Sequence, residues 1–333
     1  MSLPVSALPD SGTGLSALVE LPGPYSLGAS LAPLAHGRRD PTTLVGADEA
    51  WLAFATADGD ATLRLAVLPS SGAAVPRTGP AGPVLVRASA WGPGAEAALD
   101  RVPRLLGADD DWSGFDDAGF LATLPRLVTE TRRRNPGLRL PACGRMLDTL
   151  VPVILEQKVT LMEAYSAWRY LVTKFGRPAP GPGPVHLRVA PDAAGWRRVP
   201  SWEWHRAGVD SSRSGAVMRA CAAASGLERL AEAPVGADLE ARLRTVPGIG
   251  PWTVAETVQR THGAPDTVSV GDFHLAKFVG AALTGRRTDD AGMLALLEPW
   301  RGHRQRVVRM LMLSGFRKQA YGPKLAPEDH RRR

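Results

Sequence analysis

The sequence predicts an α+β protein in which a small β-rich domain precedes an all-α domain. Apolar residues recur with a period of two in strand-length runs within residues 51–91, whereas apolar residues three and four positions apart dominate after residue 139. The charge changes sign between the two parts. Residues 1–130 contain eight Arg and no Lys against fifteen Asp and Glu, and residues 131–333 contain 32 Lys and Arg against 18 acids.

The domain boundaries follow from these shifts, since a chain of 333 residues has room for two or three domains. Residues 1–12 are rich in Ser and Pro, and we expect them to be disordered. Residues 13–130 form the acidic β-rich domain and residues 131–320 the basic helical domain. Residues 321–333 form a basic tail that ends in three arginines.

Three strands are predicted in the N-terminal domain. Trp51–Thr56 and Ala61–Leu68 flank Asp58-Gly59, a dipeptide that favours a tight hairpin turn. Val84–Trp91 is the third strand candidate. The pattern over Gly94–Leu106 predicts a helix, with Pro103 straining its end.

The helical domain contains apolar faces within residues 146–155 and 165–175. Further helical patterns cover Ser212–Ala224, Asp238–Thr245, Trp252–His262, Asp272–Leu283, Asp289–Leu297 and His303–Phe316. Between Arg177 and Pro200 the chain is rich in Pro and Gly, which predicts a surface loop or linker rather than part of the core.

Composition excludes several classes of protein. No run of eighteen apolar residues could span a membrane, and the N-terminus lacks the features of a secretory signal. Cys143 and Cys221 are too few for a disulfide framework or an iron–sulfur cluster, and the seven histidines do not cluster with them. We therefore expect no metal and no cofactor, and a cytoplasmic location.

The basic helical part suggests a polyanionic partner. Arg outnumbers Lys by 35 to 5, a bias typical of GC-rich coding, so part of the Arg excess is explained without any ligand. Genomic bias does not account for the segregation of acidic and basic residues. Nucleic acid is the better interpretation.

The most informative segment is Leu243–Ala255, where an amphipathic helix ends and another begins after Gly248-Ile249-Gly250. Glycines at 248 and 250 allow a sharp turn that exposes consecutive backbone N–H groups. Because these lie at a helix N-terminus, a phosphate can bind there without a side chain. An ordinary αα-hairpin is the alternative, since Gly-x-Gly alone is weak evidence.

The second segment, Thr267–Lys277, delivers Asp272 to the start of an amphipathic helix. Asp is a preferred N-cap residue, so capping alone could explain it. Its position distinguishes it, because it follows Gly250 by 22 residues and lies one helix beyond the hairpin. Asp266 is a weaker candidate, since no helix follows it directly.

Together these segments resemble the helix-hairpin-helix DNA glycosylase superfamily, whose signature is such a hairpin followed by a loop that ends in the catalytic aspartate. Within it, the chain is similar to the bacterial 3-methyladenine DNA glycosylase II group. Glu156–Thr160 resembles the group's Gln-containing turn beside the DNA, and Glu298–Arg301 resembles its pocket tryptophan segment. The resemblance covers residues 139–320. Members often carry an N-terminal domain related to the TATA-binding fold, with which residues 14–110 are compatible.

The resemblance implies a mechanism. The damaged base is flipped out of the duplex, and Asp272 stabilises the oxocarbenium-like sugar and orients the attacking water. The implied DNA-binding residues are Gly248, Ile249, Gly250, Thr253, Lys158, Arg213 and Lys277. The implied base pocket contains Trp252, Glu256, Phe273 and Trp300. Core packing is the alternative for the aromatic residues, and helix capping is the alternative for the Ser211–Ser214 segment that contains Arg213.

Two departures from the family pattern bear on whether the enzyme also cuts the strand and on which base it selects. Trp252 occupies the position where strand-cutting relatives keep a lysine, so no lyase step is expected, and Lys277 is interpreted as a phosphate contact. Glu256 stands where pocket aromatics are usual. Either it faces the pocket and favours a cationic lesion, or it is a solvated helix residue.

The sequence thus predicts a monofunctional DNA N-glycosylase that excises damaged, alkylated bases in base excision repair. Its expected partner is double-stranded DNA containing such bases, and we expect a monomer associated with the bacterial nucleoid. The alternatives are a non-catalytic protein that binds damaged DNA and a bifunctional glycosylase/lyase.

Overall fold

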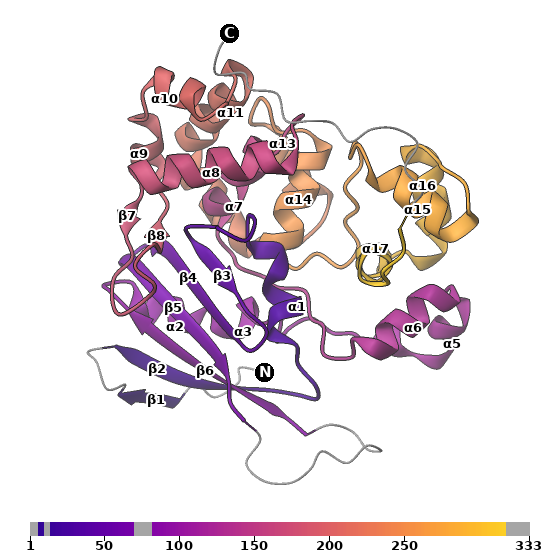
Figure 1. Cartoon of the computed structure of the whole chain (residues 1–333). Coiled ribbons are helices and arrows are strands. Elements are labelled where there is room, and N and C mark those ends of the chain that lie inside the picture. The colour runs from indigo at the N-terminus through magenta and orange to yellow at the C-terminus, as the bar shows by residue number, and fades with distance from the viewer. Residues whose placement is uncertain (1–5, 10–13, 70–81, 318–333) are drawn as a thin grey trace.

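The computed structural model describes residues 6–9, 14–69 and 82–317. Its N-terminal part contains a six-stranded antiparallel sheet with the strand order β1-β2-β6-β5-β4-β3 (Figure 1). The strands are β1 (Ser6–Pro9), β2 (Leu15–Leu21), β3 (Thr43–Val45), β4 (Glu49–Thr56), β5 (Gly59–Val67) and β6 (Val84–Trp91). The three predicted strands are confirmed. Ser6–Pro9 form an edge strand, although the sequence placed them in a disordered segment whose other residues lie outside the described ranges.

The hairpin predicted from Asp58-Gly59 is confirmed. Thr56 pairs with Gly59 across β4 and β5, and Gly59 adopts a φ of +128°, which a residue with a side chain rarely adopts. Alternate residues of β4, including Leu52 and Phe54, point into the core, as the period of a half-buried strand requires.

Short helices cover the inner face of this sheet. They are α1 (Leu27–Leu31), η1 (Ala32–Leu34), α2 (Ala95–Asp100) and α3 (Val102–Leu105). The single helix predicted over Gly94–Leu106 is therefore two helices that meet at Arg101. Pro103 lies in the first turn of α3, where its missing N–H breaks no hydrogen bond.

The remaining helices form two lobes (Figure 1). The first lobe contains α7 (Met146–Leu155), α8 (Leu161–Phe175), α9 (Ala193–Arg197), α10 (Ser201–Arg206), α11 (Ser211–Ala222), α12 (Ala224–Glu228), η2 (Arg229–Glu232), α13 (Ala237–Arg244) and α14 (Pro251–Thr261). The second lobe contains α4 (Ser113–Asp116), α5 (Ala118–Thr123), α6 (Arg126–Arg134), α15 (Leu275–Thr284), α16 (Asp290–Leu297), η3 (Glu298–Trp300) and α17 (Arg304–Leu313).

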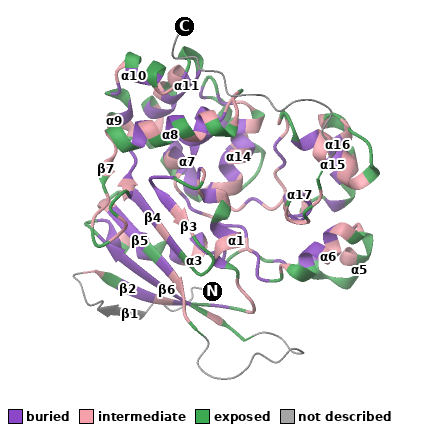
Figure 2. Ribbon diagram, viewed as in Figure 1, coloured by how far each residue is buried: buried purple, intermediate pink, exposed green. Residues whose placement is uncertain are grey.

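The second lobe joins segments that are far apart in the sequence. Phe115 and Val128 are buried in one cluster with Val279 and Leu311. Figure 2 shows buried residues on α6, α15 and α17, which contribute to this cluster. Residues 113–130 therefore pack with the C-terminal helices, although their acidic composition had placed them in the N-terminal domain. The composition of a segment does not reveal which distant segment it packs against, so the domain boundary could not be placed from charge alone.

The prediction that the Pro/Gly-rich segment 177–200 is a surface loop or linker outside the core was wrong on one point, because part of the segment is buried. It contains a two-stranded ribbon, β7 (Arg177–Pro178) and β8 (Arg188–Val189), so the helical part is not entirely α. Arg188 donates its backbone N–H to Pro41 O over 2.7 Å, and Arg177 forms an ion pair with Asp60. Leu187, Val189 and Trp196 are buried. The segment thus joins the sheet to the first lobe.

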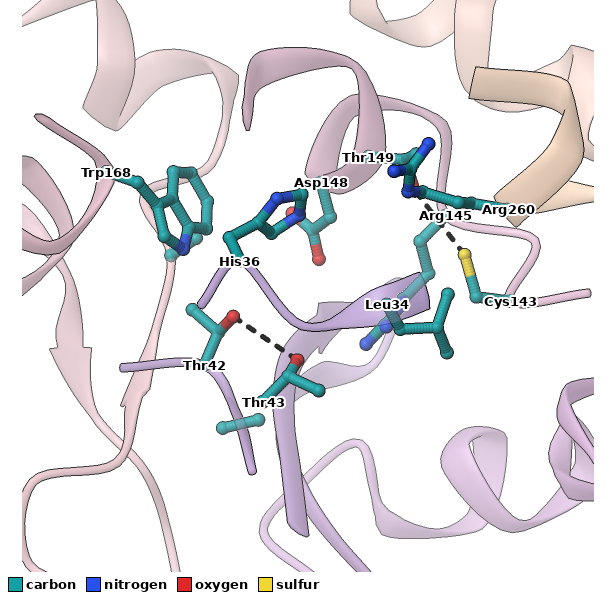
Figure 3. A pocket seen from close by; sticks show the side chains of 12 residues that line it. Leu34, His36, Thr42, Thr43, Cys143, Arg145, Asp148, Thr149, Trp168 and Arg260 are labelled. Atoms are coloured by element: carbon teal, nitrogen blue, oxygen red, sulfur yellow. Dashed lines mark hydrogen bonds between the residues drawn. The ribbon is translucent and has the colours of Figure 1, made fainter. Parts of the chain in front are cut away.

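A small cavity of about 20 Å³ lies between the sheet and the first lobe (Figure 3). Polar side chains dominate its lining, among them Arg145, Asp148 and Thr149. Burial raises the pKa of Asp148 to about 6. Cys143 also lines the cavity, and both it and Cys221 are buried free thiols.

Candidate active site

The predicted hairpin forms between α13 and α14. Gly248 has a φ of +98°, and a Cβ there would lie 2.8 Å from the Cβ of Ala216 in α11, so the turn requires a glycine. Gly250 is the extended N-cap of α14, with a φ of −94° and open space where a Cβ would lie. The protein itself thus requires Gly248, whereas at Gly250 the open space is available to a ligand.

The turn leaves backbone N–H groups at the start of α14 without an acceptor. Within the described ranges, the N–H groups of Gly250, Trp252 and Thr253 have no acceptor, and Pro251 has no N–H to offer. Ile249 differs, because its side chain is buried and its N–H donates to Val246 O. The open amides lie where the helix dipole favours an anion, so the turn can bind a phosphate.

Gln157, in the Glu156–Thr160 turn for which the resemblance implied a place beside the DNA, fixes the hairpin to the turn after α7. Its Nε2 donates to Gly248 O over 3.0 Å and to Thr253 Oγ1 over 2.9 Å. Thr253 is buried and its hydroxyl accepts from Gln157, so its side chain is not available to a ligand. Lys158 follows Gln157, is exposed and adopts a φ of +57°, which is uncommon for a residue with a side chain. The structure therefore places Lys158 beside the hairpin.

Arg213 has a structural role, which corrects its predicted contact with DNA. The residue is only 4% exposed, and its Nε donates to Asp210 Oδ2 over 2.7 Å. Its Nη1 and Nη2 donate to Leu155 O and Gly208 O, both over 2.9 Å. These bonds attach the start of α11 to the end of α7. A basic residue in a helix-capping segment is therefore not always a surface charge.

A tight turn directs Asp272 toward the hairpin. Asp272 donates its N–H to Ser269 O over 3.3 Å, and Gly271, the third residue of the turn, has a φ of +90°. Such a turn favours glycine at this position. Gly271 also donates its N–H to Asp290 Oδ2 over 3.0 Å. The turn thus lies between α14 and α16, where the two lobes meet.

The carboxylate of Asp272 is held on both of its oxygens. Oδ1 accepts the backbone N–H groups of His274 and Leu275, both over 2.7 Å, at the start of α15. Oδ2 accepts the indole N–H of Trp252 over 3.2 Å. Asp272 therefore caps a helix and also lies beside the hairpin. The two interpretations of this residue are compatible.

Asp266 is bound within the fold. It accepts from Gly302 N over 2.7 Å and from Nη2 of Arg304 over 2.6 Å. Burial raises the pKa of Asp266, but the hydrogen bonds and charge of Arg304 outweigh this and hold it below its usual value. Its carboxylate joins a loop to the start of α17, which supports the choice of Asp272.

Glu256 matches neither sequence interpretation. Its Oε2 forms an ion pair with Arg260 Nη1 at 2.6 Å, and its Oε1 accepts the hydroxyl of Ser269 over 2.5 Å. The side chain is only 18% exposed. The carboxylate is thus neither solvated nor a free negative charge that would favour a cationic base.

The aromatic candidates separate into two groups. Phe273 is 66% exposed beside Asp272, and Lys277 Nζ lies 4.4 Å from the centroid of its ring. Trp300 instead lies in the core of the second lobe, where its indole donates to Thr123 Oγ1 over 3.2 Å. Trp252, Phe273 and Lys277 therefore gather around Asp272, whereas core packing accounts for Trp300.

The described cavities do not contain Asp272. A cleft of about 360 Å³ lies between α13, α14, α16 and residues 266–270, and neither it nor the small interior cavity is lined by Asp272 or Trp252.

In the described part of the chain, no helix is long and apolar enough to cross a membrane. The same residues contain no group of three or more His, Cys, Asp or Glu side chains that could hold a metal.

No family model and no curated protein sequence matches this chain. Several solved structures are similar to it. The 3-methyladenine DNA glycosylase from Archaeoglobus fulgidus is similar with a TM-score of 0.70 at 14% identity, over 90% of this chain and 98% of that chain. The 8-oxoguanine glycosylase/lyase from Clostridium acetobutylicum, in its apo form, has a TM-score of 0.64 at 11% identity, over 95% and 100%. Its complex with double-stranded DNA has a TM-score of 0.59 at 10% identity, over 94% and 98%.

Proposed function

We propose that this chain, which has the fold of the helix-hairpin-helix DNA glycosylases, is a monofunctional DNA N-glycosylase that removes damaged bases from double-stranded DNA. One observation carries the proposal. Trp252, in the first turn of α14, donates to Asp272, so the carboxylate lies close to the open amides at the start of the same helix. One flipped nucleotide can then contact the phosphate-binding amides and the Asp272 carboxylate at the same time.

The hairpin holds the DNA backbone. The N–H groups of Gly250, Trp252 and Thr253 bind a phosphate, and exposed Lys158 contacts a neighbouring one. Lys277, whose ammonium group lies over the ring of Phe273, adds a third contact. The basic composition of the helical part supports binding that depends on salt and not on sequence.

Asp272 acts on the sugar once the base has left the stack. As the glycosidic bond breaks, positive charge develops on the sugar, and a carboxylate fixed on both oxygens stabilises it without reorganising. The same carboxylate orients the water that attacks the sugar. Phe273 and Trp252 provide ring surfaces on which the flipped base stacks.

We propose alkylated purines as the substrates. Such a base already carries a positive charge and leaves readily, so a strong general acid is not needed. Glu256 is paired with Arg260, so selection depends on how readily the base leaves and not on an unpaired pocket charge. A shared fold with the 3-methyladenine glycosylase of Archaeoglobus fulgidus supports the same choice.

A glycosylase/lyase is the second candidate, favoured by the position of Lys277 above Phe273, next to Asp272. Trp252 opposes it, because strand-cutting relatives keep a lysine at that position. A non-catalytic DNA-binding protein is the third candidate. The geometry around Asp272 opposes this one, since binding alone does not need a carboxylate beside the phosphate site.

The test is release of free base from duplexes that each carry one alkylated, deaminated or oxidised base, 8-oxoguanine included. We expect release from the alkylated duplexes, leaving an abasic site in an intact strand. Tight binding to damaged duplexes without release of any base would instead identify a damaged-DNA-binding protein.

A further inference from the structure

The side chains of α14 hold the segment that leads to Asp272. Gln259 Nε2 donates to Thr267 O over 2.9 Å and to Ser269 Oγ over 3.0 Å. Ser269 Oγ donates in turn to Glu256 Oε1 over 2.5 Å, and Ser269 is only 3% exposed. Because Ser269 begins the turn that ends at Asp272, these bonds fix where the turn starts.

Arg260 links this attachment to the N-terminal domain. Its Nη1 binds both Oε2 and the backbone O of Glu256, at 2.6 and 2.7 Å. Its Nε donates to Pro33 O in η1 over 2.8 Å. Contacts therefore run without a break from the N-terminal domain through Arg260, Glu256 and Ser269 to the turn that carries Asp272.

This ion pair differs from an ordinary salt bridge within a helix. Exposed pairs four residues apart contribute little to stability. Here the side chains of Arg260 and Glu256 are 16% and 18% exposed, and each also binds a group outside α14. Burial lowers the pKa of Arg260, but the carboxylates of Glu256 and Glu156 outweigh it, so the guanidinium remains charged.

We propose that Ser269, Glu256 and Arg260 are positioning residues for base excision. They hold the turn so that Asp272 faces the sugar, and the contact of Arg260 with Pro33 anchors them to the N-terminal domain. The inference rests on the proposed function, because it assigns these residues a role in the reaction of Asp272. A displacement of about 1 Å at a reacting group can cost about 100-fold in rate. Loosening the turn should therefore lower the excision rate without lowering the affinity for DNA.

The first test is Ser269→Ala, which removes one buried hydroxyl. We expect the single-turnover excision rate to fall by about 10- to 100-fold, with duplex affinity unchanged. Ser314→Ala is the control, because the Ser314 hydroxyl donates to Leu311 O and accepts the N–H of Phe316 at the end of α17, away from the turn. The control should retain the native rate. Equal rates for native protein and Ser269→Ala would overturn the inference.

A double-mutant cycle tests whether the residues act as one unit. Glu256→Gln keeps an acceptor for Ser269 but loses the ion pair with Arg260, so it should slow excision as well. The double variant should be no slower than the slower single variant, because both changes release the same turn. Losses that multiply would mean that the two residues act independently, contrary to the proposal.

A measurement without substrate follows the carboxylate directly. The indole N–H resonance of Trp252, assigned by its loss in Trp252→Phe, reports on Asp272 through their hydrogen bond. It should shift in Ser269→Ala and in Arg260→Lys, and remain in place in Ser314→Ala. An unmoved resonance in both variants would contradict a positioning role.

The same excision assay separates this inference from the proposed function. Should Asp272→Asn release bases at the native rate, the proposed function itself fails. Should Asp272→Asn be inactive while Ser269→Ala is fully active with an unmoved resonance, Asp272 remains catalytic and only the positioning role is lost.

Discussion

The indole N–H of Trp252 donates a hydrogen bond to Oδ2 of Asp272 over 3.2 Å, although twenty residues separate them in the chain. The bond joins the first turn of α14 to the turn that precedes α15, across the boundary between the two helical lobes. Trp252 thereby has two effects. It fills the position where an amine would permit strand cleavage, and it orients the carboxylate proposed to act on the sugar.

Asp272→Asn should leave duplex binding nearly intact while base excision falls by orders of magnitude. The amide oxygen can still accept the N–H groups of His274 and Leu275, so the helix start persists, but the negative charge needed in the transition state is lost. Asp266→Asn is the control. It should lower the melting temperature, because Arg304 loses its close ionic contact with Asp266 and keeps only a longer one with Glu298, yet keep excision per folded molecule. A native excision rate for Asp272→Asn would refute the assignment.

Trp252→Phe should slow excision by about 10-fold or more while retaining duplex affinity. The change removes the N–H and keeps most of the ring surface, and a hydrogen bond to a charged group contributes about 1.5–3 kcal/mol. Single-turnover rates and binding isotherms of the two proteins measure the separation. Weaker binding with an unchanged rate would mean that Trp252 contacts DNA and does not orient Asp272.

The two hairpin glycines should respond differently to alanine. Gly250→Ala should keep the native melting temperature and weaken binding to damaged and undamaged duplex alike, because its Cβ meets no protein atom and blocks only the phosphate. Gly248→Ala should lower the melting temperature, because its φ of +98° is unfavourable and its Cβ meets Ala216. Thermal melts and titrations with both duplexes decide the matter. A loss of binding confined to one lesion type would place Gly250 in the base pocket.

Borohydride should trap no covalent complex between the native protein and DNA that carries a susceptible base. No amine occupies the position of Trp252, so no Schiff base forms, and strand breaks should appear only after hot alkali. Lys277 is the lysine nearest to Asp272 along the chain. A trapped complex that disappears in Lys277→Ala would move this chain into the lyase class.

Asp148 should make stability fall as pH rises. Burial raises its pKa in the folded protein to about 6, from 3.8 for the free side chain, so the folded state binds the proton more tightly. Its contribution to stability is complete below the lower value and is lost as the pH rises through the higher one. Asp148→Asn should therefore raise the melting temperature relative to the native protein more at about pH 7 than at about pH 4. An equal difference at both pH values would contradict this account.

Local patterns predicted much of the candidate site. Glycines at 248 and 250 between two amphipathic helices indicated the turn, and Val-Gly-Asp before a third helix indicated Asp272. Both signals depend on backbone conformations that only certain residues adopt, so neighbouring residues suffice to reveal them. The contacts of Gln157 with the hairpin were not predicted for the opposite reason, because its two partners are 91 and 96 residues away.

Predictions from the charge or aromatic character of a residue were wrong where burial decides the role of its side chain. Arg213 and Glu256 have the residue types expected of surface or pocket groups, yet their charged atoms bind partners inside the protein. Trp300 similarly belongs to the core of the second lobe. A sequence gives the chemistry of each side chain but not which way it points.

By itself, then, the sequence determined the α+β organisation and the hairpin and singled out Asp272 as the catalytic candidate, because each depends on contacts within a few residues or on the period of an element. Only the tertiary structure decided that residues 113–134 complete the C-terminal lobe and that segment 177–200 joins the sheet to the helices. It also decided that Arg260 connects Pro33 to Glu256. These features depend on which distant segments pack together, and that is set by the sum of many small burial energies spread along the chain.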